Sequence, residues 1–280
     1  MDDSSYNSGV KVSIIIPVYN AEKYVGSAID SALTGQMDDL EILVIDDGST
    51  DSSASVISEY TDPLSEQYDP RVRYEYQENQ GKSAAVNAGF ESAEGHYITI
   101  LDADDQLPSK SLSYRYNALE EEGHFSKHLA IGEFDVFDER GDIVGHRCVP
   151  CKNNPKIIYK KFYRYYKSPF HTNACLFSHS LCEKVGLFDT RLRRCQDIDY
   201  SLRLLRETDC VAWVSETVYR YRKHRNSLSK RLQVRRKTLM HRPIVYWKNY
   251  LGWRRYFSVL TGLVLDFGKL VYELAGNYES

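Results

Sequence analysis

The sequence predicts an α/β protein with a doubly wound, mostly parallel sheet flanked by helices and followed by a C-terminal helical extension. Apolar runs of strand length alternate with helix-length segments through residue 101, which is typical of parallel sheets with right-handed crossovers. Two of the first four predicted strands run into carboxylates. Because open α/β sheets bind ligands at the carboxyl ends of their strands, we expect the functional site at that edge.

The first part of the chain contains four predicted strands and three predicted helices. After a polar segment, residues 1–10, that predicts a disordered leader, we expect strands at residues 12–16, 41–45, 72–76 and 97–101, and helices at 24–33, 52–60 and 82–93. Pro17, which cannot donate to a sheet ladder, is expected to end the first strand, and Asn20 to cap the first helix. The small residues of the third helix predict close packing on the sheet.

The remaining chain predicts further elements and then changes character. We expect a helix from Pro108 to about residue 122, strands within 128–149 and at 171–177, a helix opening at 196–199, and a last strand at 210–214. Beyond residue 230, apolar residues recur at alternating spacings of four and three, which is a heptad stripe. The stripe comprises Tyr246, Tyr250, Trp253, Phe257, Leu260, Val264, Phe267, Val271 and Leu274. It predicts a helical extension over 230–280 that contacts its own domain, a second copy of the chain or a membrane surface.

Composition and charge exclude several classes of function. A net charge of −3 over 280 residues gives no electrostatic footprint for nucleic acid. The polar N-terminus does not resemble a signal peptide, and no segment has the roughly 18 uncharged apolar residues of a spanning helix. Cys148 and Cys151 form one CxxC near His146, but no second pair stands at zinc-site spacing, so we expect no zinc site. We expect a cytoplasmic protein, peripheral at most to the inner membrane face.

Three carboxylates, Asp102, Asp104 and Asp105, follow the predicted strand at 97–101. Unpaired carboxylates this close together repel one another and need a cation. A buried strand that ends in three acids therefore predicts a metal and phosphate site.

Five motifs, in this order and spacing, resemble the family-2 inverting glycosyltransferases, which have the A-type, Rossmann-like nucleotide-sugar fold. They are VSIIIPVYN (12–20), ILVIDDGSTD (42–51), ENQGKSAAVNAG (78–89), ILDADD (100–105) and GLFDTRLRRCQDIDYSLRLL (186–205). The resemblance covers about residues 11–229. It implies a nucleotide-binding half over 11–105 and an acceptor half over 106–229.

The resemblance assigns donor-site roles to individual residues. Asp104 would ligate Mn²⁺ or Mg²⁺, and Asp102 would contact the ribose or the metal through water. The remaining donor positions are Asp47 for the uracil N–H, Pro17 and Tyr19 along the base, and Lys82 near the base or phosphates. A packed aromatic is the alternative for Tyr19, and a helix cap is the role favoured for Asp105.

The catalytic base of the resemblance is the Asp of a Glu-Asp pair, which here reads Gln196-Asp197. Asp197 is therefore the predicted base. A helix N-cap is its alternative role, and Asp199 is the alternative base. Arg203 is expected to form a salt bridge or cap rather than to touch substrate.

The segment YRYRKHRNSLS (219–229) resembles the family's mobile loop near the diphosphate. His224 and Arg225 are candidate phosphate contacts by charge. His171 lies in the stretch that borders the acceptor pocket in relatives, where it could hydrogen-bond a sugar or serve a structural role.

The sequence therefore predicts an inverting, metal-assisted transfer from a UDP-sugar to a saccharide or lipid-linked acceptor in glycan or polysaccharide synthesis. A sugar nucleotidyltransferase is a second hypothesis, but that class has a Gly-rich basic loop where Pro17-Val18-Tyr19-Asn20 stands. A non-catalytic nucleotide-sugar binding module is a third, which the Gln196 departure leaves open.

Overall fold

The computed structural model describes residues 9–120, 127–148, 158–159, 170–192, 194–208 and 210–224. Most of the predicted leader, Cys151, Arg225 and the predicted helical extension at 230–280 lie outside these described residues. No helix in the described ranges combines the length and apolar character needed to cross a membrane.

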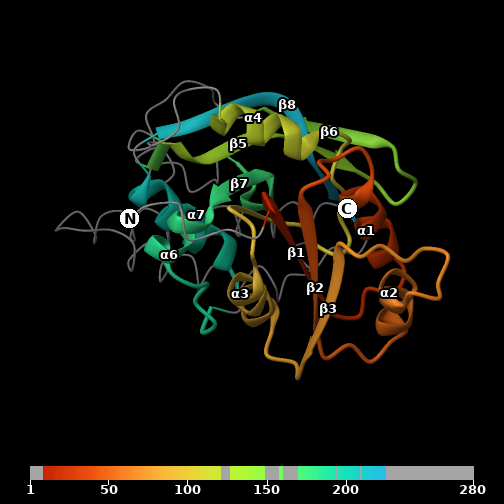
Figure 1. The fold of residues 1–280 in the computed structure, drawn as a ribbon. Coiled ribbons are helices and arrows are strands. Elements are labelled where there is room, and N and C mark those ends of the chain that lie inside the picture. The colour runs from red at the N-terminus through yellow and green to blue at the C-terminus, as the bar shows by residue number, and fades with distance from the viewer. Residues whose placement is uncertain are drawn as a thin grey trace, which may run out of the picture.

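One sheet of eight strands organises the structure (Figure 1). Its order is β3-β2-β1-β4-β7-β5-β6, and β8 pairs with β5. The strands are β1 (Val12–Val18), β2 (Leu40–Asp47), β3 (Val72–Gln77), β4 (Tyr97–Ile100), β5 (Lys127–Phe137), β6 (Ile143–Arg147), β7 (Cys175–Ser178) and β8 (Cys210–Arg222). The first four strands are mutually parallel, β5 and β8 are parallel, and β7 and β6 run antiparallel to their neighbours. The predicted mostly parallel sheet is confirmed, including β3 as its edge.

Helices cover both faces of this sheet (Figure 1). They are α1 (Val25–Leu33), α2 (Ser53–Thr61), α3 (Lys82–Ser92), α4 (Ser111–Glu120), α6 (His179–Val185) and α7 (Gln196–Glu207), with a short 3₁₀ helix η2 (Thr172–Ala174). Ile14 of β1 packs in a core with α1, α2 and α4, whereas Ile15 packs in a second core with α3, α6 and α7. Both residues are fully buried, since successive strand side chains point to opposite faces. This arrangement is the doubly wound architecture that the sequence predicts.

Pro17 does not end the first strand, contrary to the sequence prediction. β1 continues to Val18, and Pro17 pairs in register with Ile45 of β2. The Lys11 and Ile15 carbonyls accept from the backbone N–H groups of Tyr97 in β4 and of Leu101 just after it. The backbone N–H and C=O groups of odd-numbered residues in β1 therefore point toward β4. β4 ends at Ile100, opposite Ile15, and Pro17 therefore lacks an N–H where no strand lies beside it.

Two local predictions about caps are also wrong. The N-cap residue of α1 is Tyr24, while Asn20 adopts a positive φ of 51° and accepts a hydrogen bond from the Thr50 N–H. Helix α4 begins at Ser111, so Asp105 lies too far upstream to cap it. In both cases a side chain suited to a cap instead holds a loop at the sheet edge, a contact between segments distant in sequence.

The last strand is longer than the sequence predicts. β8 runs on to Arg222, so the first four residues of the predicted mobile loop at 219–229 belong to the sheet. Its register with β5 shifts at three places, which interrupts the alternation that marks a strand in the sequence. Residues 172–174 form η2 rather than the first part of β7.

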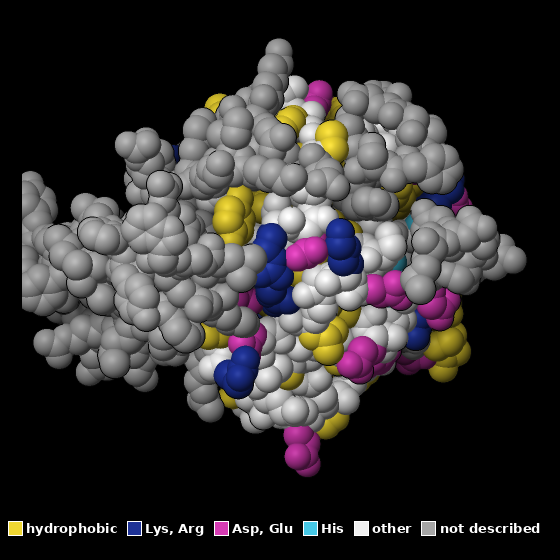
Figure 2. All heavy atoms as spheres, turned by 90° about the vertical axis from the view of Figure 1, so that its left-hand side faces the viewer, with side chains coloured by type: hydrophobic (Ala, Val, Ile, Leu, Met, Phe, Trp, Pro, Cys, Tyr) yellow, Lys and Arg dark blue, Asp and Glu magenta, His cyan; other side chains and the backbone are white. Residues whose placement is uncertain are grey.

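The face over α6 and α7 shows basic and acidic side chains interspersed wherever it is described (Figure 2). Lys184 of α6 forms an ion pair with Glu207, the last residue of α7, and Arg206 of α7 pairs with the same side chain. Charges of both signs therefore alternate on the described part of this face.

The close packing of α3 on β1 can be tested by substitution. An alanine Cβ at Gly89 would overlap the side chain of Ile15, which is fully buried. We expect Gly89→Ala to lower the free energy of unfolding by about 1–3 kcal/mol in urea denaturation, because an overpacked core must rearrange.

Gly26→Ala in α1 is the matched control. Its added Cβ would lie 3.4 Å from the Tyr60 hydroxyl and from Val56, an ordinary contact. We expect this variant to match the wild type or gain up to about 1 kcal/mol from helix propensity. Equal stability of the two variants would contradict close packing at Gly89.

Candidate functional site

A cleft of about 910 Å³ opens at the carboxyl ends of β1, β2 and β4. It adjoins a smaller, more enclosed cavity of about 240 Å³, and the two share Lys82, Asp102 and Gln196 in their walls. The cleft is also lined by Pro17, Val18, Tyr19, Asn20, Ala21, Tyr24, Asp47, Asn79, Gly81, Ala85, Ala103, Asp104 and His224. The cleft therefore lies at the sheet edge where the sequence predicts the site, and all of the predicted donor and metal residues line it.

One end of the cleft presents an exposed aromatic ring. Tyr19 follows β1 and is 53% exposed, so the alternative of a packed aromatic is wrong. Pro17 lies two residues earlier in the same wall. An exposed ring at a cleft wall can stack on a flat heterocycle.

Asp47, at the end of β2, is buried and holds a loop. Its carboxylate accepts hydrogen bonds from the Gln77 side chain at 2.7 Å and from the backbone N–H groups of Gln80 and Gly81 at 2.8 and 2.7 Å. These bonds fix the turn that leads into α3 and thereby place Lys82. Asp46 instead braces its own turn by accepting from the Ser49 N–H.

Lys82 forms an ion pair with Asp102 across the cleft. Its Nζ lies 2.6 Å from both carboxylate oxygens of Asp102. Loss of water around the two groups disfavours both charges, but the attraction outweighs it: the pKa of Lys82 is raised and the pKa of Asp102 is lowered. Both side chains are therefore charged at neutral pH. Lys82 partly neutralises the acidic loop, residues 102–105, which follows β4.

Asp104 faces His224 across the same cleft. The His224 Nε2 lies 2.7 Å from the Asp104 carboxylate, and its ring packs edge-on against Tyr24. The structure thus brings a residue 120 positions away to the predicted metal ligand. Arg225, the other candidate phosphate contact, lies outside the described residues.

Asp105 is the buried anchor of the acidic loop. It is 1% exposed, accepts from the Tyr219 hydroxyl and accepts from the Arg222 N–H at 2.7 Å, both in β8. Burial, with the nearby charges of Asp102 and Asp104, raises the pKa of Asp105 well above its ordinary value. Its predicted role as a helix cap is wrong because β8 takes both of its oxygens.

Asp197 lines the enclosed cavity from the first turn of α7, and its side chain is exposed. The N-cap residue of α7 is Cys195 in the left-handed conformation, so the alternative of Asp197 as an N-cap is wrong. Gln196 lies in the wall common to both cavities, beside the predicted base.

Asp199 is excluded as an alternative base by its surroundings. Its side chain is fully buried and lies 3.0 Å from the Arg203 Nε, one helical turn later. Arg203 also donates to the carbonyls of Val185 and Leu187. The predicted salt-bridging role of Arg203 is confirmed, and the pair holds α7 against the end of α6.

His171 lines the same enclosed cavity as Asp197. Its Nδ1 accepts from the Asn173 N–H at 3.3 Å, and its ring stacks on Tyr219 with centroids 5.3 Å apart. Burial lowers the pKa of His171, so the ring is neutral at neutral pH and its Nε2 carries the proton. A neutral donor of this kind suits a sugar hydroxyl.

The acidic loop has the donor set that a hard divalent cation requires. One oxygen from each of Asp102, Asp104 and Asp105 lies within 4.8 Å of the others. Carboxylate oxygens are the preferred ligands of Mg²⁺ and also suit Mn²⁺. Because β8 occupies both oxygens of Asp105, Asp104 and Asp102 are the members that face the cleft.

Comparison with known proteins identifies the family to which this sheet and its cleft belong. The model of "Glycosyl transferase family 2" matches residues 13–186, more than half of the chain. This chain belongs to glycosyl transferase family 2. Glycosyltransferase GlyA of Streptococcus pneumoniae is 35% identical over 46% of this chain and 17% of its own length. Uncharacterized glycosyltransferase EpsJ of Bacillus subtilis is 29% identical over 78% of this chain and 62% of its own length.

Solved structures share the fold at low identity. TarS 1–349 of S. aureus in complex with UDP-GlcNAc has a TM-score of 0.65 at 18% identity and matches 92% of this chain and 72% of its own. The mannosyltransferase PcManGT of Pyrobaculum calidifontis, in complex with GDP-Man and Mn²⁺, has a TM-score of 0.60, also at 18% identity, over 98% of this chain and 77% of its own. These likenesses confirm the predicted fold class of the family-2 chain.

The sequence did not predict several residues of the candidate site. Tyr24 and Asn79 line the cleft, and Ser83, Thr172, Asn173, Phe188 and Tyr221 line the enclosed cavity. Tyr219 and Arg222, which hold Asp105, were placed in a loop. The loop motif does not indicate this role, because the role depends on β8 lying beside the acidic loop, more than 100 residues away in sequence.

The grip of β8 on Asp105 can be tested by removing one hydroxyl. In Tyr219→Phe, the buried Asp105 oxygen loses its donor and the Asn173 amide loses an acceptor at 2.9 Å. We expect the free energy of unfolding to fall by about 1–3 kcal/mol in urea denaturation, the cost of unsatisfied buried polar groups.

Tyr221→Phe is the matched control for this prediction. Tyr221 lies in the same strand and is half-buried. Its hydroxyl does not hold Asp105, whose oxygens accept from the Tyr219 hydroxyl and the Arg222 N–H. We expect a change within about 0.5 kcal/mol. Equal losses in the two variants would show that the Asp105 contact is not what stabilises the loop.

Proposed function

We propose that this family-2 protein is a metal-dependent, inverting glycosyltransferase that uses a UDP-sugar. The acceptor would be a saccharide or a lipid-linked saccharide in glycan or polysaccharide synthesis. One observation carries the proposal: the exposed Tyr19, the carboxylate of Asp104 and the carboxylate of Asp197 line two adjoining cavities with shared walls. That order matches a donor's base, its diphosphate and the reacting carbon.

In this proposal the donor lies along the 910 Å³ cleft. The base stacks on Tyr19 beside Pro17, and Asp47 borders the base while it fixes the loop before Lys82. Lys82 and His224 supply positive charge or hydrogen bonds to the diphosphate. Each of these residues lines the cleft, which supports their assignment to the donor.

Asp104 and Asp102 would hold Mn²⁺ or Mg²⁺ through carboxylate oxygens. The cation would stabilise the charge that develops on the departing diphosphate. The contacts with Lys82 and His224 occupy these carboxylates here, so those two side chains would have to turn toward the phosphates when metal binds. Both side chains remain partly exposed and can move.

Asp197 would act as the general base in a single displacement. The acceptor oxygen forms a bond to the anomeric carbon, the bond from that carbon to the diphosphate oxygen breaks, and the hydroxyl proton passes to Asp197. His171 would orient a sugar hydroxyl in the enclosed cavity by donating from Nε2. Exposure of Asp197 and its place in the cavity wall support this role.

The proposal is tested most directly by thermal shift with UDP-sugars and GDP-sugars, each with and without Mn²⁺. We expect stabilisation by UDP-sugars that increases with Mn²⁺, because a ligand that binds only the folded state raises the melting temperature. A GDP preference would change the donor assignment. Absence of any nucleotide effect would contradict the whole donor site.

The metal assignment predicts the behaviour of Asp104→Asn. We expect calorimetry to show the Mn²⁺-linked part of UDP affinity lost, because the amide cannot supply an anionic ligand. Asp142→Asn, which removes an exposed charge on the β5–β6 turn, is the matched control and should keep that affinity. Undiminished Mn²⁺ dependence in Asp104→Asn would place the metal elsewhere.

The base assignment predicts a separation of binding from transfer in Asp197→Asn. We expect UDP-sugar affinity near that of the wild type and transfer slower by about 10²- to 10⁴-fold, the range for loss of a general base. Measured turnover with donor and acceptor checks the rate, and calorimetry checks binding. Turnover near the wild-type rate would exclude Asp197 as the base.

A further inference from the structure

Four side chains of types that can bind metals gather on one face of the β5–β6 hairpin, on strands that do not line the 910 Å³ cleft. Glu133 and Asp135 are two residues apart in β5 and so point to the same face. Asp135 pairs across the hairpin with His146 of β6. Cys148 lies two residues after His146, so its side chain also follows that face.

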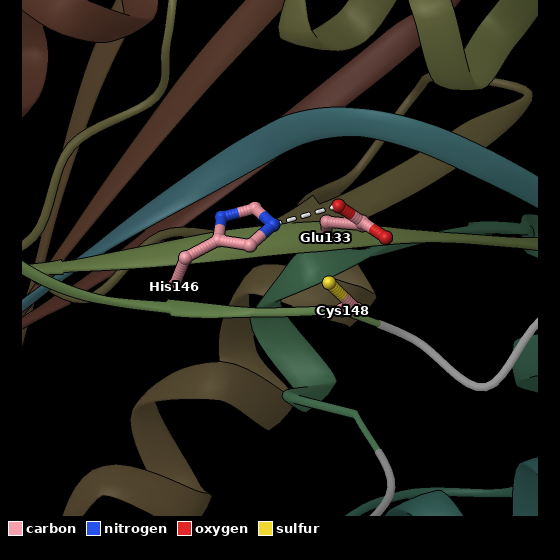
Figure 3. Close-up of side chains that lie close together, drawn as sticks. All are labelled: Glu133, His146 and Cys148. Atoms are coloured by element: carbon pink, nitrogen blue, oxygen red, sulfur yellow. Dashed lines mark hydrogen bonds and ion pairs between the residues drawn. The ribbon is translucent and has the colours of Figure 1, made fainter.

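The donor atoms of this cluster converge. Glu133, His146 and Cys148 each offer one ligand atom, and these atoms all lie within 4.8 Å of one another. Figure 3 shows the His146 ring directed toward Glu133, with the Cys148 sulfur on the same side of the hairpin. The His146 Nε2 lies 2.8 Å from the Glu133 carboxylate. The set therefore combines imidazole nitrogen, carboxylate oxygen and sulfur.

We propose that Glu133, His146 and Cys148 form a zinc site on the β5–β6 hairpin, separate from the cation site of the acidic loop. Thiolate and imidazole suit Zn²⁺, whereas Mg²⁺ and Mn²⁺ favour oxygen ligands alone. With three protein ligands, a solvent molecule would complete the usual four-coordinate shell.

Asp135 orients the histidine of the proposed zinc site. Its carboxylate lies 2.6 Å from the His146 Nδ1, which therefore carries a proton and donates. That bond leaves Nε2 as the ligand nitrogen and aims it between Glu133 and Cys148. Metal-ligating histidines commonly donate their other ring N–H to a carboxylate in this way, which fixes the ring. Asp135 is accordingly a positioning residue.

The geometry needs only a small adjustment to hold the ion. Tetrahedral zinc with bonds of about 2.0–2.1 Å would separate the His146 nitrogen and the Glu133 oxygen by roughly 3.4 Å, more than their present 2.8 Å. The His146 side chain is 43% exposed and can make that shift, while Glu133 is 12% exposed and held in the sheet. Without a metal, a doubly protonated His146 ring would donate from Nδ1 to Asp135 and from Nε2 to Glu133, and cobalt binding distinguishes these two states.

The zinc site lies behind the acceptor side of the cavity. Phe134, between Glu133 and Asp135, points to the opposite face of β5, where its ring packs edge-on against His171 at 5.5 Å. A metal that joins β5 to the end of β6 would stiffen the strand that supports His171. This gives the site a structural role independent of the donor metal.

Cobalt substitution of the reduced, metal-free 280-residue chain tests the proposal. We expect one equivalent of Co²⁺ to give a sulfur-to-cobalt charge-transfer band in the near ultraviolet and the intense visible bands of four-coordinate cobalt. Zn²⁺ should displace the cobalt and Mg²⁺ should not. Absence of the charge-transfer band in the wild type would overturn the zinc site.

Variants locate the band. Cys148→Ser and His146→Ala should lose it, whereas Cys210→Ser, a matched control at the start of β8, should keep it. Asp104→Asn should also keep it, because the acidic loop offers no sulfur. A band that persists in Cys148→Ser, or disappears in Asp104→Asn, would overturn the assignment. Circular dichroism confirms that each variant is folded, and the wild-type spectrum decides if one is not.

The positioning role of Asp135 has its own readout. We expect Asp135→Asn to keep the cobalt spectrum but to bind Zn²⁺ about 10- to 100-fold more weakly in competition with a chromophoric chelator, the range for loss of a histidine-orienting partner. An unchanged affinity would show that Asp135 does not orient His146.

Discussion

The hold of β8 on Asp105 is the constraint on which the candidate active site depends. Asp105 is buried and takes hydrogen bonds from Tyr219 and the Arg222 backbone, so the loop after β4 cannot move away from β8. Arg222 adds a second bond, from its guanidinium to the Asp104 carbonyl at 2.7 Å. Because one acid of the loop is fixed inside the protein, its two neighbours, Asp102 and Asp104, are turned toward the cleft. A buried carboxyl group is costly unless it is hydrogen-bonded, and the bonds that satisfy Asp105 also hold the loop in this orientation.

The electrostatics of the loop follow from the same arrangement. Three adjacent carboxylates repel one another, and each is matched to a different group: Asp102 to Lys82, Asp104 to His224, and Asp105 to Tyr219 and the Arg222 N–H. The partners of Asp102 and Asp104 are partly exposed and replaceable, whereas those of Asp105 are buried. A cation or a diphosphate can therefore compete for the outer two without disturbing the anchor. The backbone of the loop is thus held by Asp105, while the carboxylates of Asp102 and Asp104 can exchange their partners for a ligand.

The two cavities show why the halves of the chain must fold together. The 910 Å³ cleft is lined by the ends of β1, β2 and β4 and the start of α3, all within the first 105 residues, and by Gln196 and His224 from the second half. The enclosed cavity takes Asp102 and Lys82 from the first half and His171, Asn173 and Asp197 from the second. The antiparallel pairing of β7 with β4 joins them. Loss of that pairing would separate the proposed base from the proposed metal ligands while leaving each half's motifs intact.

The sequence by itself determined the sheet and the edge where the candidate site lies. Apolar runs such as 41–45 and the acids after them are local signals, since strand burial and the alternation of strands and helices need only neighbouring residues. Tertiary structure alone decided which acids are buried in contacts and which face the cleft. Asp105 became an anchor because β8 lies beside it, Asp199 was removed as a base by Arg203, and His146 met Glu133 because the hairpin register places them together. Each of these depends on a contact distant in sequence, and the energy of a side chain depends on the partners and water around it.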